Sequence, residues 1–167
     1  MKRIGLISDT HGYLDERIIA HLDDCDEIWH AGDIGAEEVT DRLAETALLR
    51  AVHGNIDGGD LRAAFPENLH FETGGLRVWI THIAGTPKRY PPRIREVLEA
   101  EKPDVFVCGH SHICRVERDS RHGHMHMNPG AAGRHGWHKV RTLLKFEVNL
   151  GKIENLRVVE LGSRSKS

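Results

Sequence analysis

Short apolar runs alternate with helical patterns over the first third of the chain. A run at residues 4–7 has the length of a buried strand, and apolar residues then recur at helical spacing over 14–24. The same two patterns follow at 27–30 and 36–46, and a further apolar run covers 48–52. This succession predicts a βαβαβ unit, in which right-handed crossovers join parallel strands.

The middle of the chain has a different pattern. Two short runs, 69–72 and 76–80, flank the turn residues 73–75, which predicts a β-hairpin. A helix is expected over 92–101, because Ile94, Val97 and Leu98 fall on one helical face. Proline is well tolerated at its start. The apolar run 105–108 then predicts another buried strand.

The last third of the chain shows no clear helical pattern. Short strands, separated by Gly and Pro, are predicted near 114–118, 123–127, 141–148 and 152–160. A parallel half followed by an antiparallel half indicates an α/β fold of two packed sheets with helices outside them. We expect one domain over 1–161 and a disordered tail over 162–167, where apolar side chains are absent.

Composition narrows the class of the protein without identifying it. Of 167 residues, 39% are hydrophobic and 29% are charged, as in ordinary globular domains. The formal net charge of -2 predicts no extended nucleic-acid binding and no attraction to anionic membranes. No run approaches the roughly 18 apolar residues of a membrane span. The N-terminus does not resemble a signal peptide, and three cysteines without C-x-x-C spacing favour a cytoplasmic location.

Residues with metal-ligating side chains follow five of the predicted strands. They are Asp9 and His11, Asp33, Asn55, His82, and His110 with His112. In open α/β sheets, the carboxyl ends of strands are where ligands bind. Two carboxylates, one amide and four imidazoles exceed the needs of one metal, whereas two metals bridged by a carboxylate would use them all. These oxygen and nitrogen ligands suit transition metals better than Ca²⁺ or Mg²⁺.

In order along the chain, these blocks resemble the five-part signature of the calcineurin-like metallophosphoesterases. The matching segments are Asp9-Thr10-His11, Gly32-Asp33, Gly54-Asn55, His82, and Gly109-His110-Ser111-His112. The short length and the Asn128-Pro129-Gly130 turn resemble the compact bacterial and archaeal phosphodiesterases of that superfamily. The resemblance implies a two-sheet β-sandwich flanked by helices (α/β/β/α). It also implies hydrolysis of phosphodiesters by a metal-bridging hydroxide, with no protein nucleophile.

The same resemblance assigns the ligands of two divalent transition metal ions. Asp33 would bridge them, with Asp9, His11 and His112 completing the first site and Asn55, His82 and His110 the second. Mn²⁺ is the expected metal, with Ni²⁺, Fe²⁺, Co²⁺ and Zn²⁺ as alternatives. Many members of the superfamily have a histidine directly after the Gly-Asn block, where this chain has Ile56. The group that protonates the leaving oxygen is therefore unassigned.

Five further residues are candidates for supporting the site or contacting the substrate. They are His53, Asp57, Lys88, Arg89 and Asn128. His122, His124 and His126 alternate along a predicted strand, which favours a solvated strand face over an additional metal site. The basic segment 134–139 favours a surface hairpin over a contact with a nucleotide.

The expected function is that of a dinuclear phosphodiesterase acting on a small phosphodiester or nucleotide. A phosphomonoesterase would carry the same motifs. A non-catalytic scaffold is the third alternative, because a retromer trafficking subunit with this fold resembles these enzymes. Degraded ligand positions would favour the scaffold, and all seven positions are filled here. The oligomeric state, including a homo-oligomer, is left open.

Overall fold

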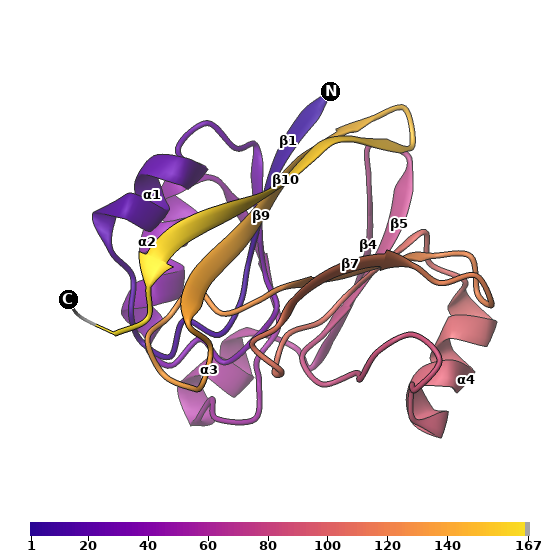
Figure 1. Cartoon of the computed structure of the whole chain (residues 1–167), viewed down its shortest axis with the longest axis horizontal. Helices are drawn as coiled ribbons and strands as arrows, with labels where there is room; N and C mark the ends of the chain where they lie inside the picture. The colour runs from indigo at the N-terminus through magenta and orange to yellow at the C-terminus, as the bar shows by residue number, and fades with distance from the viewer. Residues whose placement is uncertain (166–167) are drawn as a thin grey trace.

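The structure is a computed structural model, which describes residues 1–165. Two five-stranded sheets face each other, with α1, α2 and α3 outside one sheet and α4 outside the other (Figure 1). This arrangement confirms the predicted α/β class and the two-sheet architecture. No helix among residues 1–165 is long and apolar enough to cross a membrane.

The first sheet has the strand order β10-β9-β1-β2-β3. Its bounds are Lys2–Ile7 for β1, Glu27–His30 for β2, Leu48–Ala51 for β3, Val140–Asn149 for β9 and Lys152–Ser163 for β10. β1, β2 and β3 are parallel, and α1 (Glu16–Leu22) and α2 (Glu37–Thr46) connect them as predicted. β9 pairs antiparallel with β1, and β10 with β9.

The second sheet has the order β4-β5-β6-β8-β7. Its bounds are Asn68–Thr73 for β4, Leu76–Thr81 for β5, Val105–Val107 for β6, Cys114–Arg118 for β7 and Met125–Pro129 for β8. β4 and β5 form the expected hairpin, but β5, β6 and β8 are parallel. Parallel pairing therefore extends into both sheets and is not confined to the first half of the chain.

Three helix boundaries follow from local chemistry. Asp15 caps α1, because its carboxylate accepts a hydrogen bond from the Ile18 amide at 3.0 Å, so the helix begins after residue 15 and not at 14. α4 (Pro92–Glu101) has Pro92 in its first turn and ends at Lys102 in the left-handed conformation. α3 (Gly59–Ala64) was not expected, because this six-residue helix buries only Leu61.

The main core lies between the sheets. Ile4, Leu6 and Trp29 of the first sheet belong to the same buried cluster as Val78 and Ile80 of the second. Burying such a side chain contributes about 1.5–3 kcal/mol. This shared core fixes the two sheets relative to each other, and with them the strand ends that carry the predicted ligands.

Two expectations from the sequence are wrong. His124 and His126 are each only 1% exposed, because α4 and Tyr90 cover the strand face that was predicted to be solvated. The predicted disordered tail also begins too early, since Gly162 and Ser163 complete β10 by pairing with Arg141 and Val140. Residues 166–167 of that predicted tail lie outside the described residues.

Candidate metal centre

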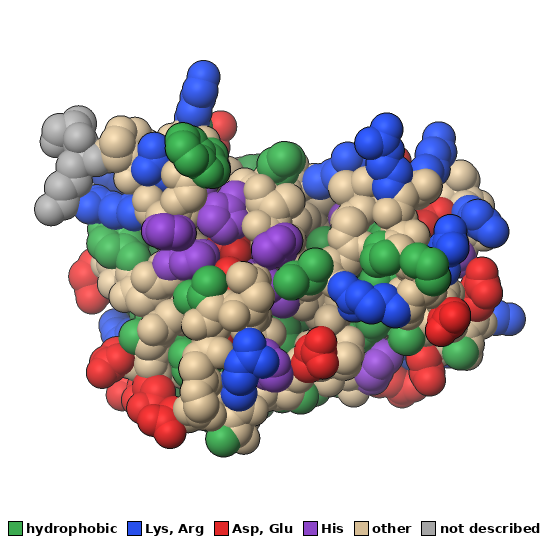
Figure 2. Space-filling model, turned by 90° about the horizontal axis from the view of Figure 1, so that it is seen from below, with side chains coloured by type: hydrophobic (Ala, Val, Ile, Leu, Met, Phe, Trp, Pro, Cys, Tyr) green, Lys and Arg blue, Asp and Glu red, His purple; other side chains and the backbone are tan. Residues whose placement is uncertain are grey.

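All seven predicted metal ligands lie at one edge of the molecule. They follow β1, β2, β3, β5 and β6, whose carboxyl ends meet between the two sheets at the lower edge of Figure 1. Seen from below, histidine side chains surround acidic ones in a hollow of the surface (Figure 2). The parallel strands of both sheets therefore bring together residues from distant parts of the chain.

Asp33 occupies the centre of this group. Its Oδ2 lies 3.4 Å from Nε2 of His11 and 3.2 Å from Nε2 of His82. Its Oδ1 accepts a hydrogen bond from the Ile56 amide at 3.1 Å, which fixes the orientation of the carboxylate. One oxygen of Asp33 thus faces ligands from both predicted metal sites, as a bridging ligand would.

The remaining ligands form one group on each side of Asp33. Asp9, His11 and His112 have ligand atoms close together, with His112 Nε2 at 3.1 Å from Asp9 Oδ1. Asp33, His82 and His110 form the second such group. Asn55 joins the second group, because its Oδ1 lies 3.1 Å from His110 Nδ1.

Several buried polar atoms of the site have no hydrogen-bond partner among residues 1–165. They are Asp9 Oδ1, His11 Nε2 and His82 Nε2. His82 Nδ1 donates to the carbonyl of Ala31 at 2.7 Å, so in the neutral ring Nε2 directs a lone pair at the carboxylates. A cation between these atoms removes the repulsion, and nitrogen and oxygen donors suit a divalent transition metal. The side chains present therefore fit the metal centre.

The pKa values of the site carboxyls and of His11 also indicate that positive charge stabilises this site. Burial raises the pKa of the Asp9 and Asp33 carboxyls, but the neighbouring histidines lower it more, so both pKa values lie below the ordinary range. The nearby carboxylates of Asp33 and Asp9 raise the pKa of His11 to about 9. In the metal-free protein, protons on histidines therefore provide the charge that metal ions would otherwise supply.

The backbone holds five of the ligands in a strained conformation. Nine non-glycine residues in 1–165 have positive φ, and five of them are the predicted ligands Asp9, His11, Asp33, His110 and His112. This left-handed conformation costs about 1–2 kcal/mol per residue. Such strain is concentrated at functional sites, where the surrounding fold determines the conformation.

Two glycines allow the loops to approach the carboxylates closely. A Cβ atom on Gly54 would clash with Oδ1 and the backbone amide of Asp33. A Cβ atom on Gly109 would clash with Ser8 Oγ and lie 2.7 Å from Asp9 Oδ2. Both glycines are therefore required for the ligand loops to meet.

Comparison with known proteins identifies the family. A model described as the calcineurin-like phosphoesterase superfamily domain matches residues 1–151. The chain belongs to this superfamily. It is therefore a metal-dependent phosphoesterase, a hydrolase acting on phosphoric esters, and the family implies divalent metal ions. A probable metallophosphoesterase of Methanocaldococcus jannaschii is 28% identical over 134 residues, which cover 77% of this chain and 67% of that relative.

Solved structures share the fold at low identity. An archaeal phosphodiesterase has a TM-score of 0.75 and 21% identity, over 95% of this chain and 99% of its own. A predicted phosphoesterase of Streptococcus pneumoniae TIGR4 has a TM-score of 0.73 and 20% identity, over 96% and 90%. Zn²⁺-complexed Vps29 of Entamoeba histolytica has a TM-score of 0.71 and 16% identity, over 96% and 99%.

Three residues behind the centre of this phosphoesterase fix its loops. Asp57 accepts hydrogen bonds from the backbone amides of Ile34, Gly35 and Gly54, at 2.8–3.1 Å. Asn128 donates to the carbonyl of Gly109 at 3.0 Å and to Ser111 Oγ at 3.1 Å. His30, with a pKa lowered by burial to about 4, lies 3.0 Å from Thr10 Oγ1 between the first two ligands. These contacts fit the supporting role predicted for Asp57 and Asn128.

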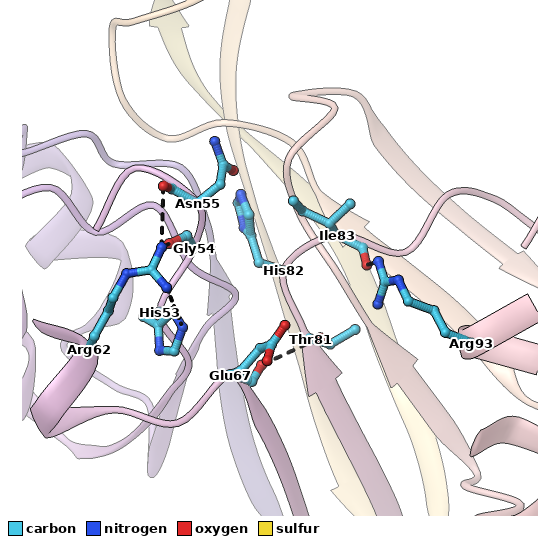
Figure 3. A pocket seen from close by; sticks show the side chains of 9 residues that line it. All are labelled: His53, Gly54, Asn55, Arg62, Glu67, Thr81, His82, Ile83 and Arg93. Atoms are coloured by element: carbon cyan, nitrogen blue, oxygen red, sulfur yellow. Dashed lines mark hydrogen bonds between the residues drawn. The ribbon is translucent and has the colours of Figure 1, made fainter. Parts of the chain in front are cut away.

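A pocket of about 170 Å³ opens beside Asn55 and His82 (Figure 3). Arg62 from α3 and Arg93 from α4 reach toward it from opposite sides. His53 also lines it, with Nε2 at 3.4 Å from Arg62 Nη1. His53 was a candidate from the sequence but the two arginines were not, because both lie on helices and outside the ligand blocks.

A larger pocket of about 520 Å³ lies in front of His11, Asp33 and the 110–112 loop. His135, Trp137 and His138 line it, and His135 stacks on His11 with ring centroids 4.8 Å apart. The segment 134–139, interpreted above as a surface hairpin, thus contributes a wall of the site. The mixture of basic residues and one tryptophan was the signal that could have placed it there.

Lys88 and Arg89 are exposed in the loop before α4. Neither contributes to the lining described for the two pockets beside the metal centre. Their contact with a substrate remains a prediction, and Arg62 and Arg93 are cations that border the site directly.

Proposed function

We propose that the protein hydrolyses phosphodiesters at a centre of two divalent metal ions. Asp9, His11 and His112 would hold one ion, Asn55, His82 and His110 the other, and Asp33 would belong to both. The position of Asp33 Oδ2, 3.4 Å from His11 and 3.2 Å from His82, carries this proposal. Mn²⁺ is the proposed metal, because a set of imidazole, amide and carboxylate ligands suits it without thiolates.

The chemistry of phosphoester hydrolysis matches this arrangement. Bound divalent ions would activate water and neutralise charge on the phosphoryl group. His135, stacked on His11, lines the larger pocket, where it would contact phosphate oxygens. Arg62 and Arg93 would add positive charge on the side of Asn55. A substrate would therefore be held by its phosphate in the hollow between the two pockets.

The apolar rim of the hollow favours a diester over a monoester. Nine large hydrophobic residues are exposed among those that the structure describes, and four of them, Ile56, Ile83, Ile113 and Trp137, line the two pockets. Trp137 is 97% exposed. An organic group on each side of the phosphate would cover this surface, and a nucleotide base would stack on the indole.

The decisive experiment compares variants of the ligands on an aryl phosphodiester with added Mn²⁺. Asp33→Ala and His110→Ala should each abolish turnover, whereas His21→Ala on α1, away from the site, should leave it unchanged. Parallel rates on the corresponding monoester distinguish the two esterase alternatives, and a faster monoester rate contradicts diester specificity. Turnover that survives either ligand change contradicts the proposed centre.

A second experiment tests the apolar rim. Trp137→Ala should raise KM for an aryl diester about threefold to tenfold and leave kcat nearly unchanged, because the indole would bind the ground state and the transition state alike. A metal-loaded protein that is inert on every phosphoester would instead favour the scaffold alternative, in which the same rim contacts a protein partner.

A further inference from the structure

A second cluster of metal-ligating side chains lies away from the catalytic edge. Asp119 and His122 belong to the turn between β7 and β8, and His124 directly precedes β8. The turn lies beside α4, with His122 Nε2 at 3.9 Å from Glu99 Oε1 of that helix (Figure 1). One ligand atom from each of Asp119, His122 and His124 lies within 4.8 Å of the others. None of these residues belongs to the predicted catalytic centre.

The distances within this cluster are those of a metal site. Asp119 Oδ2 lies 3.0 Å from His122 Nδ1 and 3.8 Å from His124 Nε2. Zinc bonds of about 2.0–2.1 Å in tetrahedral geometry place neighbouring ligand atoms about 3.3 Å apart. Small side-chain adjustments would therefore suffice to enclose an ion.

No Lys or Arg side chain in residues 1–165 forms an ion pair with the cluster. Asp119 is 3% exposed, and within residues 1–165 its carboxylate makes ion-pair contacts with imidazoles alone. Its Oδ1 accepts hydrogen bonds from the backbone amides of Arg121 and His122 at 2.8 and 3.2 Å, which hold the carboxylate in place beside the two imidazoles. A buried carboxylate with no Lys or Arg partner is suited to a cation from solution, which would offset part of the cost of its burial.

The unpartnered nitrogen of His122 gives a second indication. His122 Nε2 is buried and has no hydrogen-bond partner in the described part of the chain. While His122 Nδ1 donates to Asp119, its Nε2 directs a lone pair toward the Glu99 carboxylate. An ion on Nδ1 would shift the proton to Nε2, where Glu99 would accept it, which is the usual arrangement behind a metal-bound histidine.

We propose that Asp119, His122 and His124 bind an additional divalent transition metal ion that fastens the β7–β8 turn against α4. Zn²⁺ fits best, because it accepts two imidazoles, one carboxylate and a fourth ligand in tetrahedral geometry. The Tyr90 hydroxyl lies 3.0 Å from His124 Nε2 and borders the fourth position. The site is separate from the proposed catalytic centre and does not depend on the phosphodiesterase assignment.

Metal counting tests this site directly. Purified protein would be dialysed against buffered Zn²⁺ and the bound metal measured by inductively coupled plasma mass spectrometry. His122→Ala should lose one equivalent of Zn²⁺ per chain relative to the wild type, and the control His21→Ala should lose none. Phosphodiester turnover of His122→Ala should stay within about twofold of the wild type. An unchanged metal count in His122→Ala overturns the proposal.

A crystallographic measurement covers the case in which a variant fails to fold. Wild-type crystals soaked in Zn²⁺ should show an anomalous peak between Asp119, His122 and His124, and its absence overturns the proposal. Comparing the variants Asp33→Ala and His122→Ala also separates this site from the catalytic centre. If Asp33→Ala leaves phosphodiester turnover intact while His122→Ala still loses one equivalent, the proposed function is wrong and the second site remains.

Discussion

Two buried carboxylates on neighbouring strands of the first sheet have opposite surroundings. Glu27, at the amino end of β2, is 2% exposed and accepts hydrogen bonds from Lys2, Arg50, Trp29 and Thr73 at 2.8–3.1 Å. Asp9, just after the carboxyl end of β1, is fully buried, and its Oδ1 has no hydrogen-bond partner in residues 1–165. The chain provides Lys2 and Arg50 as partners for the first carboxylate, whereas the ion-pair partners of the second within residues 1–165 are all imidazoles.

This difference separates a structural carboxylate from a binding one. A buried charge is stable when cations and donors of the protein surround it, and breaking such a set is strongly destabilising. A buried carboxylate whose ion-pair partners are all imidazoles is suited to a cation from solution, because neutral imidazole is a common metal ligand. Asp119 is of the second kind, which links it to Asp9 and not to Glu27.

The largest expected effect concerns catalysis. Asp9→Asn should lower the Mn²⁺-dependent hydrolysis of an aryl phosphodiester at least 1000-fold, about 4 kcal/mol in the barrier. Glu27→Gln, which removes an equally buried charge, should leave the rate within about twofold. Initial rates under saturating Mn²⁺ measure both. Equal losses in the two variants would contradict the distinction between the carboxylates.

Metal binding should stabilise the protein through Asp9 and not through Glu27. At a free Mn²⁺ concentration of 100 times Kd, the free energy of unfolding should rise by about 2.7 kcal/mol. Asp9→Asn should lose this gain and Glu27→Gln should keep it. Urea unfolding with Mn²⁺ or a chelator, in the His122→Ala background to remove the second cluster, gives the measurement. Retained stabilisation in Asp9→Asn would exclude this carboxylate as a ligand.

Glu27 should instead govern acid stability. Burial raises its pKa, but hydrogen bonds from Arg50, Trp29, Thr73 and Lys2 lower it to about 2 in the folded protein. The unfolded value is about 4.3, so the stabilisation is complete above that pH and is lost as the pH falls toward 2. Glu27→Gln should cost about 1.5–3 kcal/mol at neutral pH in the metal-free protein.

Urea unfolding of the metal-free protein between pH 6 and 2.5 checks this expectation. The free energy of unfolding should fall more steeply below pH 4.5 in the wild type than in Glu27→Gln. Parallel curves would show that Glu27 has the same pKa in both states. Lys2 is partly exposed, so added salt should weaken only a part of the effect.

The edge of the molecule that carries the seven predicted metal ligands could be predicted from the sequence, because each group of ligands follows an apolar strand. Parallel strands place their carboxyl ends together, so Asp9, Asp33 and Asn55 had to meet. His82 and His110 follow β5 and β6, and the structure shows that these strands are also parallel. The order of strands and ligand blocks along the chain was therefore sufficient to predict which residues form the site. The position of one sheet relative to the other was not predicted.

The burial of His124 and His126 could not be predicted from the order of elements along the chain. His124 and His126 alternate with glycine and methionine, a pattern that resembles a half-exposed strand. The decisive fact is tertiary: α4 covers this face, and the Tyr90 hydroxyl provides the buried rings with a polar partner. The position of Trp137 beside the site also depends on tertiary structure, because the sequence of a loop does not reveal which surface the loop borders.

The smallest expected effect extends the comparison to Tyr90. Its hydroxyl lies 3.0 Å from His124 Nε2 and 2.7 Å from His126 Nδ1, so this buried group, like Glu27, is satisfied within the chain. Tyr90→Phe should lower the free energy of unfolding by about 1 kcal/mol, because it leaves a buried nitrogen without a partner. Tyr13→Phe, which removes a hydroxyl 3.2 Å from Asp15 in a partly buried position, should cost less. Urea unfolding in the presence of a chelator measures the stability of both variants. A Tyr90→Phe protein with unchanged stability but impaired turnover would contradict this expectation and place Tyr90 among the groups that serve catalysis.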